Sequence, residues 1–448
     1  MANSRKSSSD KLGASVAAVV SRLIPSGSRI LVGLSGGIDS VVLLHLLAGL
    51  APHHAWRISA LHVHHGISPN ADHWAKFCIE LCAELGIALH VEHVDIEPLR
   101  ARGIEAAARE LRHAAFACQP CDFVALAHHA DDQVETLLLQ LLRGCGVRGA
   151  SAMAQLGPGK LVRPLLYCTR DEISAYAEAF GLRWIEDESN ADQDYPRNFL
   201  RHRLLPELES KFPSYRATLT RSTRHFAEAA GLLDELAHID AASSIRQDRL
   251  ALSSLQGLSE PRAKNLLRHF LHLQGAPMPQ ESRLSEMLQQ LSTAQQGASV
   301  CIDFGGWQVR RYRDFAYALR DPGEFDRHLV LRWQGEASLP WPALGGCVEF
   351  SAGQGISLER LSRAEVTLRL RQGGEVLRLQ QSGRTLKNLL QQHEVPPWLR
   401  ERWPLLYCGD ELVLIPGIAI ADEYRAKNGE ASLSVRCGTT ATLPEGGA

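Results

Sequence analysis

The sequence predicts an α/β protein: an N-terminal parallel-sheet nucleotide-binding domain, then a mostly helical middle domain and a small α+β C-terminal domain. Three observations lead to this fold class. Apolar runs of strand length alternate with helix-length stretches in the first part of the chain, a glycine-rich turn lies at the first strand-to-helix junction, and the alternation stops near Phe212-Pro213. Strands that alternate with helices at this spacing are typical of a parallel sheet with crossover helices.

The N-terminal elements follow from the apolar pattern. Buried strands are expected at residues 29–34, 58–64, 89–96 and 122–128. Helices are expected at 40–50, 72–85, 105–117 and 131–143. A further helix is predicted after Thr169, because Thr169 and Glu172 have the spacing of a capping box and Gly181 suits the helix end.

Changes in this pattern predict three domains, at residues 1–212, 213–325 and 326–448. In the middle domain we expect helices at 263–273 and 283–291 with no strand between 214 and about 295, then strands at 299–303, 307–312 and 315–319. In the last domain we expect short strands at 365–371 and 411–415 and a helix at 385–393.

The composition excludes several classes of protein. With 448 residues, 45% hydrophobic and 22% charged, the chain is neither disordered nor fibrous. Lys+Arg 48 minus Asp+Glu 50 gives −2, so a nucleic-acid partner must be met by local basic patches. Ten cysteines are too sparse for a disulfide framework, and no apolar leader or membrane-length run is found. We therefore expect a cytoplasmic protein without a membrane segment.

The glycine-rich turn is Ser35-Gly36-Gly37-Ile38-Asp39-Ser40. Adjacent glycines allow positive φ and close backbone approach to an anion, and the helix start supplies free N–H groups. Ser35 and Ser40 add hydroxyl donors, and Asp39 could hold a magnesium ion that bridges phosphates. These features favour a phosphate cradle. Residues 33–37 also match the G-x-S-x-G nucleophile elbow, with Ser35 as nucleophile, and a plain capped turn is a third interpretation.

A second group of polar residues opens the helix expected at 131–143. His128, Asp132 and Glu135 are spaced i, i+4 and i+7, which is one helical face if the helix already includes His128. Two carboxylates with an imidazole suit magnesium binding, attraction of an ammonium group or proton transfer. The alternative is an acidic helix start that only complements the helix dipole.

Two arginines lie one turn apart on the helix expected at 105–117. Arg109 and Arg112 could brace phosphates or a base edge. The alternative is a solvated helix surface, with pairs such as Glu105 and Arg109 at i, i+4.

The turn at 35–40 resembles the pyrophosphate loop (PP-loop) of the N-type ATP pyrophosphatases, which cleave ATP between its α- and β-phosphates and adenylate a substrate oxygen. Together, the motifs resemble those of the tRNA(Ile)-lysidine synthase family in the same order along nearly the whole chain. The matching segments are SGGIDS (35–40), HVHHGISPNAD (62–72), GIEAAARELRH (103–113), AHHADDQVETLLLQLLRGCG (127–146), RPLL (163–166), DESNADQDYPRNFLRHRLLP (187–206) and 370–420. The middle domain carries the least of this resemblance.

The resemblance implies a ligase with ATP and Mg²⁺ as cofactors. Such enzymes adenylate C2 of the wobble cytidine 34 of tRNA(Ile) with a CAU anticodon. The ε-amine of free L-lysine then displaces AMP to form lysidine, which changes decoding from Met/AUG to Ile/AUA. Carried over by motif, residues 35–40 would hold the nucleotide, Asp39 and Asp132 the metal, and Glu135 the metal or the lysine amine. His128 would accept the amine proton, and Arg109 would steady the adenylate or the base.

The resemblance also implies that the middle and C-terminal domains bind tRNA. Residues 197–224 include seven Lys/Arg and two Asp/Glu, and residues 360–402 include nine Lys/Arg and four Asp/Glu. Such patches suit phosphate contacts, although a solvated surface between domains is the alternative. The residues expected to contact tRNA are Arg112, Arg197, Asn198, Arg201, Arg203, Arg384 and Lys387.

Other functions remain open at this point. Cys118 and Cys121 form a C-x-x-C pair, and some PP-loop relatives use cysteines to thiolate tRNA, so a tRNA thiolase is one alternative. One pair gives only two ligands, where zinc and iron–sulfur sites need about four. A serine hydrolase built on Ser35 and a non-catalytic RNA-binding protein are further alternatives, and the sequence leaves a homodimer open.

Overall fold

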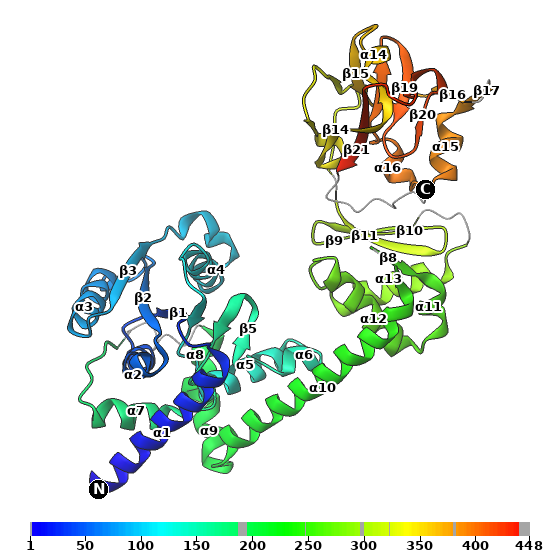
Figure 1. The fold of residues 1–448 in the computed structure, drawn as a ribbon. Helices are drawn as coiled ribbons and strands as arrows, with labels where there is room; N and C mark the ends of the chain where they lie inside the picture. Colours follow the sequence, from blue (N-terminus) through cyan, green and yellow to red (C-terminus); the bar gives the residue numbers. More distant parts are fainter. Residues whose placement is uncertain are drawn as a thin grey trace. The chain divides into compact units, whose positions relative to one another are not determined.

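A computed structural model describes residues 2–186, 195–246, 248–295, 300–321, 323–379 and 382–438. The chain divides into two compact units, Met1–Leu232 and Leu233–Ala448, which are described separately (Figure 1). The three-domain division at 212 and 325 stays a prediction. Among the described residues, no helix combines the length and the apolarity needed to cross a bilayer.

The first unit is built on a six-stranded sheet with the order β3-β2-β1-β4-β6-β5. All neighbouring strands are parallel except β5, which runs antiparallel to β6, so the predicted parallel sheet is confirmed. The carboxyl ends of the parallel strands therefore meet at one edge, where ligands bind in open α/β sheets. The strands are β1 (Arg29–Gly33), β2 (Arg57–His64), β3 (Ala88–His93), β4 (Phe123–Ala125), β5 (Leu156–Gly157) and β6 (Leu161–Val162).

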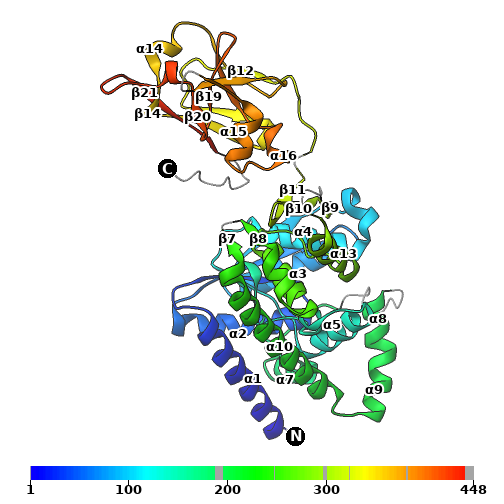
Figure 2. The ribbon, with the colours of Figure 1, turned by 90° about the vertical axis from the view of Figure 1, so that its right-hand side faces the viewer.

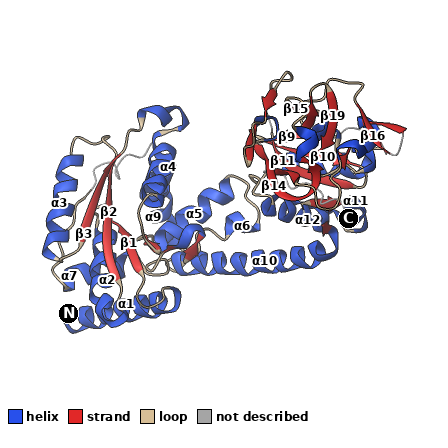
Figure 3. Cartoon of the chain, turned by 45° about the horizontal axis from the view of Figure 1, so that its top comes forward, coloured by secondary structure: helices blue, strands red, loops and turns tan. Residues whose placement is uncertain are grey.

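Helices cover both faces of this sheet (Figure 3). Side chains alternate along β1: Ile30 and Val32 belong to the large core cluster, whereas Leu31 belongs to a smaller cluster on the other face. The large cluster includes residues of α1, α2, α3 and α7, and the smaller one includes Phe116 of α4. These helices are α1 (Ala2–Leu23), α2 (Ile38–His54), α3 (Ala71–Glu84), α4 (Ile104–Ala117) and α7 (Arg170–Ala179).

Two helix starts in this unit differ in how well the sequence indicates them. The capping box before α7 is confirmed, because Thr169 Oγ1 accepts from the Glu172 N–H and the Glu172 carboxylate accepts from the Thr169 N–H. In contrast, the polar start of the chain does not predict α1. That helix is held from its second half, where Leu12, Val16 and Val20 recur every four residues and are fully buried.

The remaining helices of the first unit follow the acidic motif. They are α5 (Ala130–Leu142), α6 (Val147–Ala150), α8 (Pro196–Phe199), a π-helical turn (Leu200–Leu204), α9 (Leu205–Lys211) and the long α10 (Tyr215–Ser244), which continues into the second unit. Val134, Leu205 and Tyr215 form a small buried cluster that fixes α9 and the start of α10 against α5. Residues 187–194 of the motif at 187–206 lie outside the described residues.

The second unit begins with a five-stranded antiparallel sheet and three helices. The sheet order is β7-β8-β11-β10-β9, and Leu267, Phe270 and Leu284 of the helices are fully buried against it. The expectation that no strand lies between residues 214 and about 295 is wrong, because β7 and β8 pair within 245–251. Strands of two and three residues are too short to show an alternating pattern. The elements are β7 (Ile245–Arg246), β8 (Arg249–Ala251), α11 (Leu252–Gly257), α12 (Glu260–Leu273), α13 (Glu281–Thr293), β9 (Cys301–Phe304), β10 (Trp307–Tyr312) and β11 (Phe315–Arg320).

The rest of the second unit is a small α+β fold around the fully buried Trp341, as predicted in class (Figure 2). One sheet has the order β12-β15-β18-β19-β20, a second has the order β13-β14-β21, and β16 pairs with β17. The strands are β12 (Val330–Arg332), β13 (Ser338–Trp341), β14 (Gly346–Ser357), β15 (Val366–Arg369), β16 (Val376–Leu379), β17 (Ser382–Thr385), β18 (Leu405–Cys408), β19 (Glu411–Ile415), β20 (Ala419–Ile420) and β21 (Ser432–Gly438). The helices are α14 (Leu358–Leu361), α15 (Leu386–Gln392) and α16 (Pro397–Arg400).

Candidate active site

The glycine-rich turn joins β1 to α2 at the carboxyl edge of the sheet. Gly36 has φ +88°, and a Cβ there would lie 2.7 Å from Cδ1 of Ile185. The Gly36 carbonyl accepts a hydrogen bond from the Ile185 N–H at 2.9 Å. Both the positive φ and the close neighbour require glycine at this position. The turn is therefore held in one shape by the fold around it.

The start of α2 offers unused N–H groups. Gly37 is the N-cap and has no side chain to accept from the first turn, so the helix start is left for another acceptor. The Ser40 hydroxyl donates to the Gly37 carbonyl at 2.9 Å and lies 3.1 Å from the Ser35 hydroxyl. These bonds shape the turn as an anion cradle before any ligand arrives. The Ser35 hydroxyl contacts the Ser40 hydroxyl and the Gly37 N–H, so among the described residues no base activates it as a nucleophile.

A second strand-to-helix junction faces the cradle. His129, not His128, is the N-cap of α5, and its N–H donates to Oδ2 of Asp132 at 3.0 Å. The His129 ring is only 5% exposed. Its Nε2 lies 3.8 Å from Oδ1 of Asp39 and 3.6 Å from Oδ2 of Asp132, and its Nδ1 lies 3.5 Å from Oδ2 of Asp131. The two acids predicted to bind metal thus approach the same ring nitrogen.

The two neighbouring histidines have opposite electrostatics. Burial lowers the pKa of His129, but Asp131, Asp132 and Asp39 outweigh it, so the pKa is raised overall. Burial dominates at His128 and lowers its pKa to about 4, with Asp132 opposing and nearby arginines adding. The three acids therefore favour the protonated form of His129, whereas His128 is neutral at pH 7. Sequence spacing favours His128 and misses His129, since β4 ends at Ala125 and α5 begins only at Ala130.

Glu135 is fully buried and is paired with two arginines. Arg201 donates from Nε to Oε1 at 2.7 Å and from Nη2 to Oε2 at 3.1 Å, and Arg197 Nε lies 3.2 Å from Oε2. Burial raises the pKa of Glu135, although Arg201 and Arg197 oppose this. Arg201 also reaches Oδ1 of Asp132 at 3.4 Å. The structure thus places two residues predicted to contact tRNA against the acids of the site.

The other acids of the site are paired as well. Arg170 donates to Oδ2 of Asp39, and Arg216 donates to Oδ1 of Asp131. Burial opposes ionisation of Asp131, but His129 and Arg216 hold its pKa well below the usual range. Oδ1 of Asp39 differs from these, because it is buried and has no hydrogen-bond partner. This atom faces His129 and is the acceptor that remains for a ligand of the site.

The cradle and the acids enclose one cavity of about 850 Å³. Its position at the carboxyl edge of a parallel sheet, with phosphate-binding geometry on one wall and carboxylates on the other, suits a nucleotide and an ammonium-bearing substrate. Residues that line it include Ser35, Gly37, Asp39, His129, Asp131, Glu135, Arg170, Trp74 and Trp184.

A magnesium ion fits the residues present. Mg²⁺ needs only one or two carboxylates when phosphate oxygens and waters complete its shell. Asp39 offers an unpartnered buried oxygen beside the cradle, and Asp132 lies across His129 from it. Among the residues that the structure describes, no group of three or more His, Cys, Asp or Glu could hold a metal unaided. A metal ion bound here would therefore take some of its ligands from the nucleotide's phosphate oxygens.

His128, Asp132 and Arg197 are not among the residues that line this cavity, and the other predicted residues lie apart from it as well. Arg109 and Arg112 are exposed on α4, Asn198 lies on α8 and Arg203 in the π-helical turn. In the second unit, Arg384 donates to Oε1 of Gln392 at 3.3 Å, and Lys387 is exposed on α15. Cys118 is exposed and Cys121 is half-buried, between α4 and β4.

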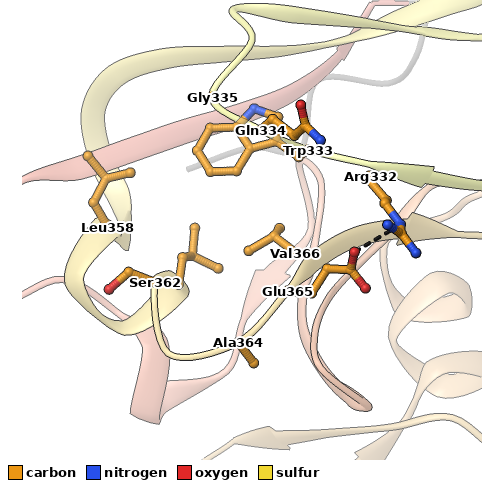
Figure 4. Close-up of a pocket in the computed structure, with 10 residues that line it drawn as sticks. Arg332, Trp333, Gln334, Gly335, Leu358, Ser362, Ala364, Glu365 and Val366 are labelled. Atoms are coloured by element: carbon orange, nitrogen blue, oxygen red, sulfur yellow. Dashed lines mark ion pairs between the residues drawn. The ribbon is translucent and has the colours of Figure 1, made fainter.

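Two further cavities contain none of the predicted site residues. One of about 610 Å³ lies at the ends of β2 and β3 and is lined by His64, His65 and His93, from the motif at 62–72 and the next strand. Another, of about 330 Å³, lies in the second unit (Figure 4). There Trp333 stacks on Phe350 with ring centroids 4.9 Å apart, and Arg332 pairs with Glu365 at one side of the cavity.

The fold and this site define a PP-loop nucleotide-binding protein, and residues 9–208 match the family model described as the PP-loop domain. Residues 250–317 match the TilS substrate binding domain, and residues 366–437 match the TilS substrate C-terminal domain. The chain belongs to the tRNA(Ile)-lysidine synthase family. It is 43% identical to the tRNA(Ile)-lysidine synthase of Nitrosomonas europaea over 91% of this chain and 92% of that one.

Other relatives and solved structures are similar to this chain. The tRNA(Ile)-lysidine synthase of Coxiella burnetii is 37% identical over 91% of this chain and 92% of that one. A solved U34-tRNA thiolase from Methanococcus maripaludis covers 50% of this chain and 80% of its own, with 18% identity and a TM-score of 0.43. Membership of the family confirms the resemblance that the motifs show and does not favour the thiolase or hydrolase alternatives.

Proposed function

We propose that the protein is an ATP-dependent ligase that adenylates C2 of the wobble cytidine 34 of tRNA(Ile) with a CAU anticodon and couples free L-lysine to it. AMP and pyrophosphate are released, and the lysidine formed reads AUA as isoleucine. The observation that carries the proposal is the cavity between the anion cradle at 35–40 and the acids Asp39, Asp131 and Glu135, with Asp132 close to the His129 ring that also lines it. Family membership supports the choice of reaction.

The chemistry has two steps. The C2 carbonyl oxygen of cytidine attacks the α-phosphorus of ATP, and pyrophosphate leaves. The lysine ε-amine then adds at C2, loses a proton, and expels AMP together with that oxygen. Adenylation is needed because the oxygen alone is a poor leaving group. The target base must leave its stack, which costs least in a single-stranded loop.

The residues divide this work between them. The N–H groups of the turn and the start of α2 would bind the phosphate chain. Asp39 and Asp132 would hold Mg²⁺, which neutralises phosphate charge when bound. The acids would also attract the lysine ammonium. His128, which is neutral at pH 7, could accept a proton from the amine, whereas the acids around His129 favour its protonated form. His129 instead keeps Asp39, Asp131 and Asp132 together.

Incubation with labelled lysine, ATP-Mg²⁺ and a CAU-anticodon tRNA(Ile) tests this function. The tRNA is expected to gain label, with AMP formed in equal amount. The same tRNA with a changed first anticodon base is the matched control and should stay unlabelled. An absence of lysine incorporation into a transcript that a characterised relative modifies would overturn the proposal.

A further inference from the structure

Arg163, the first residue of the RPLL motif, has no part in the chemistry above, yet the fold buries it. It follows β6 at the carboxyl edge of the sheet and is only 7% exposed. Its Nη1 donates to the Ala154 carbonyl at 2.8 Å, whereas its Nε is buried without a hydrogen-bond partner. Over the described ranges of the chain, no ion pair joins this guanidinium to a carboxylate. Arg163 is thus a buried cation whose charge the described protein does not compensate.

The charged groups around Arg163 are also cations. Burial lowers the pKa of Arg163 to about 10, and repulsion from Arg109 of α4 adds to this. His113, one turn further along α4, has its pKa lowered by burial and by Arg109, Arg112 and Arg163. The cations of α4 and Arg163 at the end of β6 therefore act on one another electrostatically and make this region electropositive.

The energetics argue against a purely structural role. Burying an unpaired guanidinium destabilises the folded state, which an apolar side chain at the same place would avoid. Gly157 lies directly beside the guanidinium: a Cβ at this position would lie 3.0 Å from Nη1 of Arg163. The absence of a side chain at Gly157 therefore makes space for the guanidinium group. An uncompensated cation that the surrounding fold accommodates is expected where an anion from outside completes the site.

We infer that Arg163, together with Arg109, forms a phosphate-binding site that takes a backbone phosphate of the RNA substrate beside the reacting nucleotide. The inference rests on the proposed function for its RNA partner. Sheet order separates the end of β6, which Arg163 follows, from the end of β1, which the cradle follows, by two strand spacings, on the order of 10 Å. A phosphate here is thus distinct from those held at 35–40. Bidentate N–H groups suit a phosphodiester, and bases need not be read.

Binding of full-length variants to tRNA(Ile) at several salt concentrations tests the inference, without ATP or lysine present. Arg163→Met should weaken binding about 10-fold and reduce the slope of log K against log salt by about 1. Arg163→Lys keeps the charge and should keep most of the slope. The matched control is Arg57→Met, an exposed arginine at the amino end of β2, which should leave the slope unchanged.

Two outcomes would overturn the inference. If Arg163→Met and Arg163→Lys lower the melting temperature alike and leave the salt slope unchanged, Arg163 is only a clamp on Ala154. If Arg163→Met raises KM for ATP while the slope for tRNA stays, the phosphate belongs to the nucleotide and not to RNA. Because this measurement needs no turnover, a wild-type protein that binds tRNA but incorporates no lysine would contradict the proposed function alone.

Discussion

The two sides of the α5 start differ in how their charges are balanced. On the side of His129, four carboxylates lie near an imidazole whose pKa three of them raise, and each of the four is paired with an arginine. On the side of His128, the buried Arg163 has no acidic partner among the described residues, and Arg109 repels it. Two adjacent histidines thus mark the border between a compensated region and an uncompensated one.

The two regions therefore differ in whether they need a bound ligand to balance their charges. A network in which every charge is paired keeps its geometry without a ligand, so its acids are already in position when ATP and lysine bind. An uncompensated cation is stabilised only when an anion is brought to it. We therefore expect substitutions in the first region to affect chemistry and stability, and those in the second to affect RNA binding and its dependence on pH and salt.

The largest effect is expected for Asp39→Asn. The substitution removes charge beside the cradle, where the buried Oδ1 has no other partner, and should lower kcat by about 10²–10³-fold. Steady-state lysine incorporation measures it, with tRNA binding as a check that the fold is kept. The control is Asp122→Asn, a carboxylate that pairs with Arg29 at the amino edge of the sheet. Equal losses in both variants would contradict the placement of the site.

The next effect is expected on stability, from Glu135→Gln. The fully buried carboxylate holds Arg197 and Arg201, and its loss leaves both guanidinium groups short of a counter-charge. The free energy of unfolding should fall by about 3 kcal/mol, measured by denaturant titration. Glu209→Gln breaks the half-exposed pair with Arg216 and should cost less than about 1 kcal/mol. Similar losses for the two would mean that burial of Glu135 does not matter.

A smaller, pH-dependent effect is expected at His65, on the cationic side. Burial, then Arg112, lowers its pKa from 6.5 to about 4. Between these values the unfolded chain binds a proton that the folded protein does not, so stability falls as pH falls through this window. His65→Gln should remove about 1 kcal/mol of that fall, once solvent screening is allowed for. Unfolding curves at pH 6.5 and pH 4.5 measure it, and parallel losses in both proteins would refute the assignment.

The smallest effect is expected for the double substitution Cys118→Ser and Cys121→Ser. Both cysteines lie outside the cavity lining, between α4 and β4. Lysine incorporation should stay within about twofold of wild type, since surface substitutions change little. A large loss, or iron bound in proportion to protein, would favour the thiolase interpretation instead.

Much of the first unit could be predicted because its strands are apolar runs between clear turns. The anion cradle could also be predicted, since two adjacent glycines directly after a strand have few other structural roles. The role of His129 could not be predicted, because the spacing of His128, Asp132 and Glu135 suggests a helical face that begins at His128, two residues before α5 does. Nor does sequence show that Arg197 and Arg201 reach back across more than 60 residues to Glu135. A run of basic residues predicts a positively charged surface, but it does not show which buried acid an arginine will pair with in the fold.

The path of the cytidine oxygen tests the central claim most directly. Transcripts of CAU-anticodon tRNA(Ile) with heavy oxygen at C2 of the wobble cytidine can be reacted with ATP and lysine, and the AMP analysed by mass spectrometry. If the RNA is adenylated in the cavity between the cradle and the acids, the label moves to the phosphate of AMP. Label retained in the RNA after lysine is attached would contradict the account, because it would mean that another group, such as the lysine carboxylate, had been activated.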